Sequence, residues 1–104
     1  MIINIQYIYI YDQLNSFNIY TFKKVIELIL NCIKDLHGKY IYHGDLHFGN
    51  ILYLDNRIYL IDFDNNLSND EKRISDLQQF EIYTKYSKMN DDALQKFIDG
   101  YNPN

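Results

Sequence analysis

The stretch "YIYHGDLHFGNILYL", Tyr40–Leu54, concentrates polar and reactive side chains between two apolar runs. It holds two histidines, an aspartate, an asparagine and two glycines within residues 43–50. A simple turn requires glycine or a short polar residue, and it does not require two imidazoles, a carboxylate and a carboxamide. We therefore interpret this stretch as a functional loop between two regular elements.

The residues before this loop predict a helix, and those at the start of the chain predict a strand. Apolar residues recur at helical spacing through "FKKVIELILNCIKDLH", residues 22–37. We expect Thr21 to cap this helix at its N-terminus and Gly38 to end it in the left-handed conformation. The opening "IINIQYIYIY", residues 2–11, is rich in β-branched and aromatic residues and predicts a strand.

The residues after the loop predict a hairpin and two further helices. The runs "ILYL" and "RIYLIDF" are separated by Asp55 and Asn56, which suit a tight hairpin turn. Ser68 and Glu71 have the spacing of a capping box before a helix through "KRISDLQQFEIYTKY". A last short helix, "DDALQKFI", is expected to begin at residue 90 or 91 and to stop at Gly100. The chain is thus predicted to be one α+β domain over residues 1–104.

The composition excludes several classes of protein. A formal net charge of -4 and the absence of a Lys/Arg cluster argue against a nucleic-acid-binding patch. The single cysteine, Cys32, cannot form an intrachain disulfide and is expected in the core. The longest apolar stretch, "VIELILNCI", contains Glu27 and Asn31 and is too short to span a bilayer. We expect a soluble, cytoplasmic protein.

The helix ending in "LHGKY", the loop "IYHGDLHFGN" and the hairpin ending in "LIDFDN" together resemble the C-terminal lobe of the protein-kinase-like superfamily. The shared pattern is H-x-D-x-x-x-x-N followed by D-F-x, with Asp45, Asn50 and Asp62 at its three positions. The resemblance implies ATP and Mg²⁺ as cofactors, Asp45 as the catalytic proton acceptor, and Asn50 and Asp62 as metal and nucleotide ligands. These residue types suit phosphoryl transfer, because it depends on positioning and charge neutralisation, and Mg²⁺ prefers oxygen ligands.

Within the superfamily, the chain is most similar to small-molecule and atypical kinases. Gly44 stands where regulated protein kinases carry an arginine, and His47 where they carry a lysine. The form "HGDLHxGN" resembles aminoglycoside and choline phosphotransferases. The short path from Asp62 to "ISDLQQFE" resembles the KEOPS-complex kinase, RIO kinases and lipopolysaccharide-core sugar kinases. In that group the position of Asp76 braces the backbone of the catalytic loop.

The resemblance also suggests supporting roles for neighbouring residues. His43 is expected to pack beneath the loop. His47 is expected either to contact the site residues or to be an ordinary polar loop residue, and Asp64 either to assist the metal or to shape its loop. His37, at the end of the first helix, is expected to be a surface residue that complements the helix dipole.

The chain lacks the other half of the kinase pattern. No glycine-rich phosphate loop, strand lysine or partnering glutamate helix precedes the motif. Residues 1–14 resemble the last strand of the missing N-terminal lobe and the hinge, and residues 15–104 resemble the C-terminal lobe. We therefore expect an incomplete enzyme whose N-lobe is supplied by a second chain or by residues absent here, or a homodimer that forms through the N-terminal strand. The hydroxyl acceptor, a small molecule or a protein, is not specified by the sequence.

Three functional hypotheses follow from these observations. The first is an ATP- and Mg²⁺-dependent phosphotransferase lobe that becomes an enzyme when completed. The second is a non-catalytic pseudokinase remnant that serves as an interaction module. The third and weakest is a metal-dependent phosphohydrolase, in which His43, Asp45 and His47 would alternate on one strand face.

Overall fold

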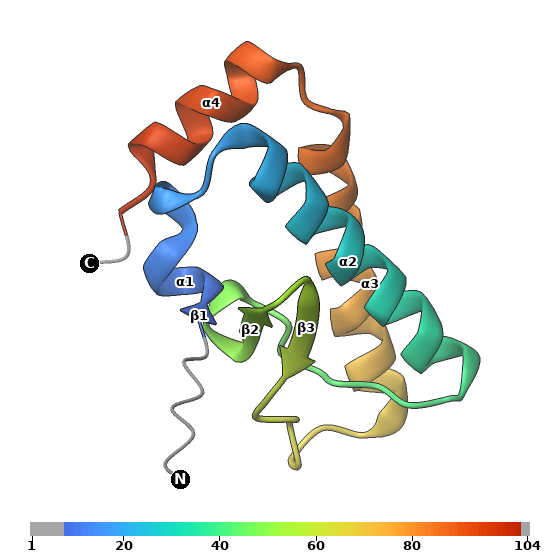
Figure 1. The fold of residues 1–104 in the computed structure, drawn as a ribbon. Helices are drawn as coiled ribbons and strands as arrows, with labels where there is room; N and C mark the ends of the chain where they lie inside the picture. Colours follow the sequence, from blue (N-terminus) through green and yellow to red (C-terminus); the bar gives the residue numbers. More distant parts are fainter. Residues whose placement is uncertain (1–7, 103–104) are drawn as a thin grey trace, which may run out of the picture.

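The structure, a computed structural model, describes residues 8–102 as an α+β arrangement. Two long helices, α2 (Ile19–Gly38) and α3 (Asn69–Lys88), lie side by side and pack against each other (Figure 1). A small antiparallel sheet holds β1 (Ile8–Tyr9), β2 (Ile51–Leu54) and β3 (Arg57–Leu60) in that order. The terminal α4 (Asp91–Gly100) packs against the start of α2, and the short α1 (Ile10–Gln13) packs against β2. The predicted α+β class is confirmed.

The ends of α2 differ from the prediction. The N-cap is Asn18, whose side chain accepts a hydrogen bond from the backbone N–H of Thr21 at 2.8 Å, so Thr21 lies inside the helix. Gly38 is the last helical residue, and the left-handed residue is Tyr40, with φ of 59°. The glycine was a misleading signal because the chain keeps helical backbone through residue 38 and reverses only two residues later.

The predicted strand over residues 2–11 is confirmed at Ile8 and Tyr9 and wrong at Ile10 and Tyr11, which are helical. Residues 2–7 lie outside the described part of the chain, and of the remainder only Ile8 and Tyr9 pair with β2. The backbone turns helical at Ile10, because Ile10 and Leu14, four residues apart, both become fully buried on one face. Burial in the core therefore overrides the β-propensity of this segment. Pairing between copies through residues 2–11 stays a prediction.

The hairpin and the capping box are confirmed. β2 and β3 pair in register from Ile51 with Leu60, and Asp55 and Asn56 occupy the turn with φ of 47° and 64°. Both positive values fit the two-residue turn that matches the twist of a hairpin. Ser68 caps α3, and its side chain and that of Glu71 each accept a hydrogen bond from the other's backbone N–H.

Asn90 caps the last helix, α4, by accepting a hydrogen bond from the N–H of Ala93. Gly100 is the final helical residue, as predicted.

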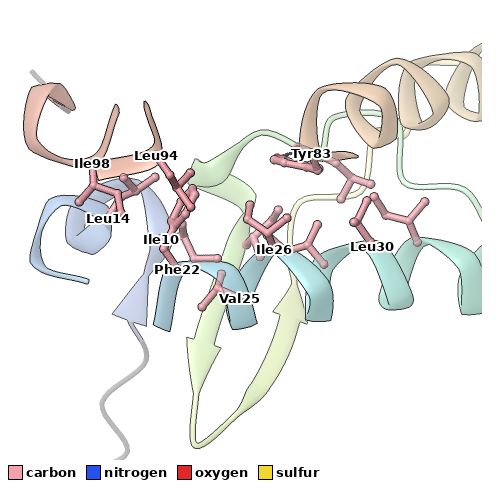
Figure 2. Close-up of a cluster of buried hydrophobic side chains, with 13 residues drawn as sticks. Ile10, Leu14, Phe22, Val25, Ile26, Leu30, Tyr83, Leu94 and Ile98 are labelled. Atoms are coloured by element: carbon pink, nitrogen blue, oxygen red, sulfur yellow. Dashed lines mark hydrogen bonds between the residues drawn. The ribbon is translucent and has the colours of Figure 1, made fainter. Parts of the chain in front are cut away.

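The core lies between α2, the sheet and the two short end helices (Figure 2). The inward residues of α2 meet Ile10 and Leu14 from the N-terminal segment and Leu94 and Ile98 from α4. The helical spacing predicted this face of α2: its fully or almost fully buried members are Phe22, Val25, Ile26, Ile29, Leu30 and Ile33. Among the described residues, no helix is both long and apolar enough to cross a bilayer.

Candidate active site

The site loop, residues 42–50, runs from the end of α2 to β2 and is held on α3 by one buried carboxylate. Asp76 of α3 is fully buried. Its Oδ1 accepts a hydrogen bond from the backbone N–H of Gly44 at 2.9 Å, and its Oδ2 accepts one from the N–H of His43 at 2.8 Å. Because both N–H groups are buried, removal of the carboxylate would leave them unsatisfied. The structure thus places Asp76 directly under the backbone of the site loop.

Two more side chains of α3 hold the same loop. The hydroxyl of Ser75 donates to the carbonyl of Gly44 at 2.8 Å, and the buried hydroxyl of Tyr83 donates to the carbonyl of Leu46. Gly44 has φ of +96°, and a Cβ there would lie 2.9 Å from Cγ of Lys72. Glycine is required at this position for two reasons. Residues with a Cβ rarely adopt this positive φ, and the backbone lies against α3.

His43 links the site loop to the segment after β3. Its Nδ1 accepts a hydrogen bond from the N–H of Asp45 at 3.0 Å, so the ring proton lies on Nε2, which donates to the carbonyl of Ile61 at 2.6 Å. The carbonyl of His43 in turn accepts from the N–H of Asp64 at 2.9 Å. These two contacts lie on either side of Asp62, so one buried histidine fixes the backbone that presents it.

Asp62 is held in an unfavourable conformation with its side chain exposed. Its φ is 56°, a left-handed value that costs a residue with a Cβ about 1–2 kcal/mol. Its carboxylate has no hydrogen-bond partner within residues 8–102. The N–H of Ile61 donates to the carbonyl of Asn50 at 3.0 Å, which brings the two chain segments together beside the loop. Asp62 is therefore an accessible carboxylate one residue after the backbone contact with Asn50.

Asn50 and Asp45 are joined directly. The Nδ2 of Asn50 donates to the backbone carbonyl of Asp45 at 2.8 Å and to its Oδ2 at 3.2 Å. This orientation of the amide, set by its two oxygen partners, leaves Oδ1 of Asn50 without a partner among the described residues. The loop therefore positions a free carbonyl oxygen and a carboxylate close to each other.

His47 lies over this pair of residues. Its Nδ1 accepts from the N–H of Gly49 at 3.0 Å, which puts the proton of the neutral ring on Nε2. That Nε2 lies 3.4 Å from Oδ2 of Asp45 and 3.2 Å from Nδ2 of Asn50. The side chains of Asp45 and His47 are 56% and 53% exposed. The sequence left two alternatives for His47, contact with the site residues or an ordinary polar loop position. The structure shows the contact with the site residues.

Asp64 shapes the path into α3. Its Oδ1 accepts from the N–H of Asn66 at 2.7 Å and from that of Leu67 at 3.1 Å. This is a side-chain turn of the kind that aspartate forms at loop starts. The contacts give Asp64 a loop-forming role at the edge of the site.

The expectation for His37 was wrong. Its side chain is 17% exposed, and its Nε2 lies 2.9 Å from Oδ2 of Asp76, so it faces the interior rather than solvent. A sequence signal for this existed: His37 lies four residues after Ile33 and seven after Leu30, on the buried face of α2. A titratable side chain on an apolar helix face becomes buried, so it requires a hydrogen-bond partner in the interior.

The residues present fit a magnesium ion held together with phosphate oxygens. Asp62 offers a free carboxylate and Asn50 a free amide oxygen, and Mg²⁺ takes one or two protein oxygens and completes its shell with phosphate and water. Among the described residues, no group of three or more His, Cys, Asp or Glu side chains can hold a metal. The strand face proposed for the phosphohydrolase is also absent, because residues 43–47 form no strand and both ring nitrogens of His43 are engaged within the chain.

Comparison with known proteins identifies the family. The profile of the lipopolysaccharide kinase (Kdo/WaaP) family matches residues 11–101. The chain belongs to this family. It is also 39% identical over 56 residues to a fowlpox virus (strain NVSL) protein named "Probable serine/threonine-protein kinase". No solved structure matches the chain.

The match with the fowlpox virus protein covers 52% of this chain and 18% of that protein's length. The chain therefore spans only a small part of this kinase relative. Together with the family match, this establishes a kinase-like chain that corresponds to part of a kinase.

Two surface hollows lie away from the site residues. One, of about 350 Å³, lies between α2 and the β2–β3 hairpin and is lined by residues such as Cys32 and Tyr59. The other, of about 140 Å³, lies between α2 and α3. Neither includes Asp45, Asn50 or Asp62. Of the three, Asp45 and Asp62 are exposed, and Asn50 is buried.

Proposed function

We propose that this chain is the catalytic lobe of an ATP- and Mg²⁺-dependent phosphotransferase. The observation that carries the proposal is the grouping of Asp45, Asn50 and Asp62 on one rigidly held loop and its neighbouring hairpin. The carboxylate of Asp62 and Oδ1 of Asn50 have no partner within residues 8–102, and the carboxylate of Asp45 accepts one hydrogen bond, from Asn50 to its Oδ2. The buried contacts around these residues mainly hold backbone. Such an arrangement suits phosphoryl transfer, in which positioning and electrostatics provide most of the catalysis.

Asp45 is the residue that accepts the proton of the attacking hydroxyl. Its backbone and side chain are fixed by Asn50, and its N–H is fixed by the ring of His43. The carboxylate stays more than half exposed, so an acceptor hydroxyl can approach it. His47 lies 3.4 Å from Oδ2 of Asp45 and orients that carboxylate.

Asp62 and Asn50 would hold Mg²⁺ and, through it, the nucleotide phosphates. Bound there, the ion would neutralise charge that develops on the phosphate oxygens. Asp62 contributes the formal charge, because its carboxylate is free and its backbone is held on both sides by His43. Asn50 contributes a neutral oxygen that is already turned away from Asp45.

The lobe is incomplete alone. The chain has no glycine-rich phosphate loop or strand lysine, and the carboxylates of Asp45 and Asp62 are exposed. A second lobe, from another chain or from further sequence, would cover these carboxylates and hold the remaining phosphates. We therefore expect residues 15–104 to act as a C-lobe and the chain alone to transfer phosphate slowly. The acceptor is a hydroxyl of a small molecule or of a protein.

The test is single-turnover transfer from labelled ATP with the protein in excess, which reveals slow chemistry. Replacement of Asp45 by Asn keeps the shape and removes the base, and should lower the rate by about 10²–10⁴-fold. Affinity for Mg²⁺–ADP should stay within about twofold, because Asp45 is not a metal ligand in this proposal. Wild-type turnover no faster than that of Asp45→Asn would overturn the catalytic role and favour the interaction module. A collapse of nucleotide affinity in the variant would show that Asp45 binds the metal instead.

A further inference from the structure

The site loop is held in two different ways along its length. Its first half is fixed by hydrogen bonds from two backbone N–H groups to Asp76. Its second half carries Phe48, a half-buried residue whose ring packs against three other aromatic rings. Phe48 is the first residue of the short helical turn that ends at Asn50. The contacts of this ring therefore bear on the end of the loop that supplies the amide oxygen of the site.

Three tyrosines surround the ring of Phe48. Its centroid lies 5.5 Å from that of Tyr83 and 6.3 Å from that of Tyr86, both on α3. The rings of Phe48 and Tyr86 are close to parallel, at 21°. The third ring, that of Tyr101, meets Phe48 edge to face, at 6.3 Å and 86°. All three distances are in the range that aromatic pairs prefer.

The contact with Tyr101 joins the site loop to a distant part of the chain. Tyr101 directly follows α4, which is anchored in the core. The place of its ring is fixed by rings other than Phe48, namely Phe97 at 6.2 Å and Tyr11 at 6.1 Å. The ring of Tyr101 is thus a fixed support against which Phe48 rests.

We infer that Phe48 is a positioning residue for the proposed phosphotransferase, and that Tyr101 acts through it. The two rings together hold the end of the site loop that carries Asn50. This inference rests on the proposed function for its effect on Mg²⁺, and on the contacts alone for its effect on the loop.

Asn50 depends on the backbone that Phe48 anchors. The N–H of Asn50 donates to the carbonyl of His47, and its carbonyl accepts from the N–H of Ile61, both at 3.0 Å. Because Asn50 is only 6% exposed, its side chain is confined by close packing and follows its backbone. A shift of the turn at Phe48 therefore displaces the oxygen proposed to bind Mg²⁺, and this ion requires near-ideal octahedral geometry.

The experiment compares substitutions that keep or remove one ring. Phe48→Leu removes the ring and stays apolar, whereas Phe48→Tyr retains the ring. Tyr101→Leu and Tyr101→Phe make the same comparison from the other side of the contact. Phe17→Leu is the matched control, because Phe17 is also half-buried and its ring pairs with Tyr53, at 5.9 Å and 80°, rather than with Phe48.

The first readout is amide hydrogen exchange, which requires no activity. In Phe48→Leu, the N–H groups of Asn50 and Ile61 should exchange about tenfold faster relative to the core amide of Ile29. In Tyr101→Leu, which removes one of the three ring pairs, the same ratio should rise by about two- to fivefold. The ratio to Ile29 separates local loosening from a general loss of stability.

The other variants and the first half of the loop are the references. Phe48→Tyr, Tyr101→Phe and Phe17→Leu should leave the ratio for Asn50 within about twofold of the wild type. The amides of His43 and Gly44 should also stay within about twofold in every variant, because Asp76 holds them.

Three results of the exchange experiment would overturn the inference. The first is an unchanged ratio for Asn50 in Phe48→Leu. The second is an equal rise in Phe48→Tyr or in Phe17→Leu, which would mean that the ring on the loop is not what matters. The third is an equal rise for His43 and Gly44, which would mean that the loop loosens as a whole. If Phe48→Leu does not fold, Tyr101→Leu and Tyr101→Phe decide the same questions.

The second readout is the Mg²⁺ concentration required for half-maximal binding of ADP. It should rise in Phe48→Leu by about the factor by which exchange at Asn50 rises, and return in Phe48→Tyr. If the exchange result holds and the wild type binds no Mg²⁺–ADP, the positioning of the loop stands and the proposed function fails. If the wild type binds Mg²⁺–ADP and Phe48→Leu requires no more Mg²⁺, the proposed function stands and Phe48 has no part in it.

Discussion

The inner and outer sides of the site loop are built in opposite ways. On the inner side, Asp76 is fully buried and both of its oxygens accept hydrogen bonds. On the outer side, the carboxylate of Asp62 is exposed and has no partner within residues 8–102, and Asp45 is more than half exposed. The same chemical group thus holds the backbone on one side and remains available on the other. The environment, and not the residue type, separates the structural carboxylate from those that we assign to catalysis.

The contrast predicts a large stability effect for the inner carboxylate. Asp76→Ala leaves the buried N–H groups of His43 and Gly44 without acceptors, and should lower the free energy of unfolding by about 3–5 kcal/mol. Urea unfolding followed by circular dichroism measures this loss. Asp70→Ala, at an exposed position of the same helix, is the control and should change stability by less than about 0.5 kcal/mol. Equal effects from the two substitutions would remove the distinction between the sides.

Tyr83 provides a second, weaker test of the inner side. Tyr83→Phe removes the donor to the buried carbonyl of Leu46 and should cost about 1–3 kcal/mol. Burial, with smaller contributions from Tyr86 and Tyr101, raises the pKa of the Tyr83 phenol above its ordinary value.

The raised pKa of Tyr83 also determines how the stability of the protein changes with pH. The unfolded chain loses the phenol proton at a lower pH than the folded one, so the contribution of Tyr83 to stability is complete below about pH 10 and declines as the pH rises further. Urea midpoints measured at pH 8 and pH 10.5 should fall more for the wild type than for Tyr83→Phe. An equal fall in both proteins would place the pH-sensitive group elsewhere.

A smaller effect is expected at the end of α2, where the helix leads into the site loop. Gly38 is helical and has no atom within 4 Å of a Cβ built on it, whereas Tyr40 has the left-handed φ. Gly38→Ala should therefore stabilise the protein by about 0.5–1 kcal/mol. A thermal melt would register this as a higher midpoint. Destabilisation would mean that Gly38 requires the left-handed conformation after all.

The smallest stability effect is expected on the outer side. Asp45→Asn should change the free energy of unfolding by less than about 0.5 kcal/mol, because the side chain is exposed. Its transfer activity should nevertheless fall by the far larger factor given above. A matching loss of stability and activity would make Asp45 a structural residue like Asp76.

Much of the fold could be predicted from local signals in the sequence. The buried face of α2, the turn at Asp55 and Asn56, and the capping box at Ser68 each depend on residues close together in the chain, so spacing and side-chain chemistry suffice. The strand at the N-terminus was overpredicted because its propensity is local, while the burial of Ile10 against α4 is a long-range effect.

The site also combines features that local sequence reveals with features that depend on long-range packing. The sequence motif drew attention to Asp45, Asn50 and Asp62, whose roles stay a proposal. The structure joins Asn50 to Asp45 and pairs the backbone of Asn50 with that of Ile61, next to Asp62. The motif did not reveal that His37 meets Asp76, because 39 residues separate them and the contact exists only when α2 and α3 pack together. Nor could it show that Asp64 is engaged in a turn, since that depends on the backbone after the site.

The most direct test of the central claim is a calorimetric titration of ADP into the full chain with and without Mg²⁺. We predict binding that requires Mg²⁺ and that Asp62→Ala weakens more than Asn50→Ala does, because a carboxylate gives the ion a full charge and an amide gives it only a dipole. Urea unfolding of both variants checks that the fold is intact. Equal losses from the two substitutions, or a preference for Zn²⁺ over Mg²⁺, would contradict the account.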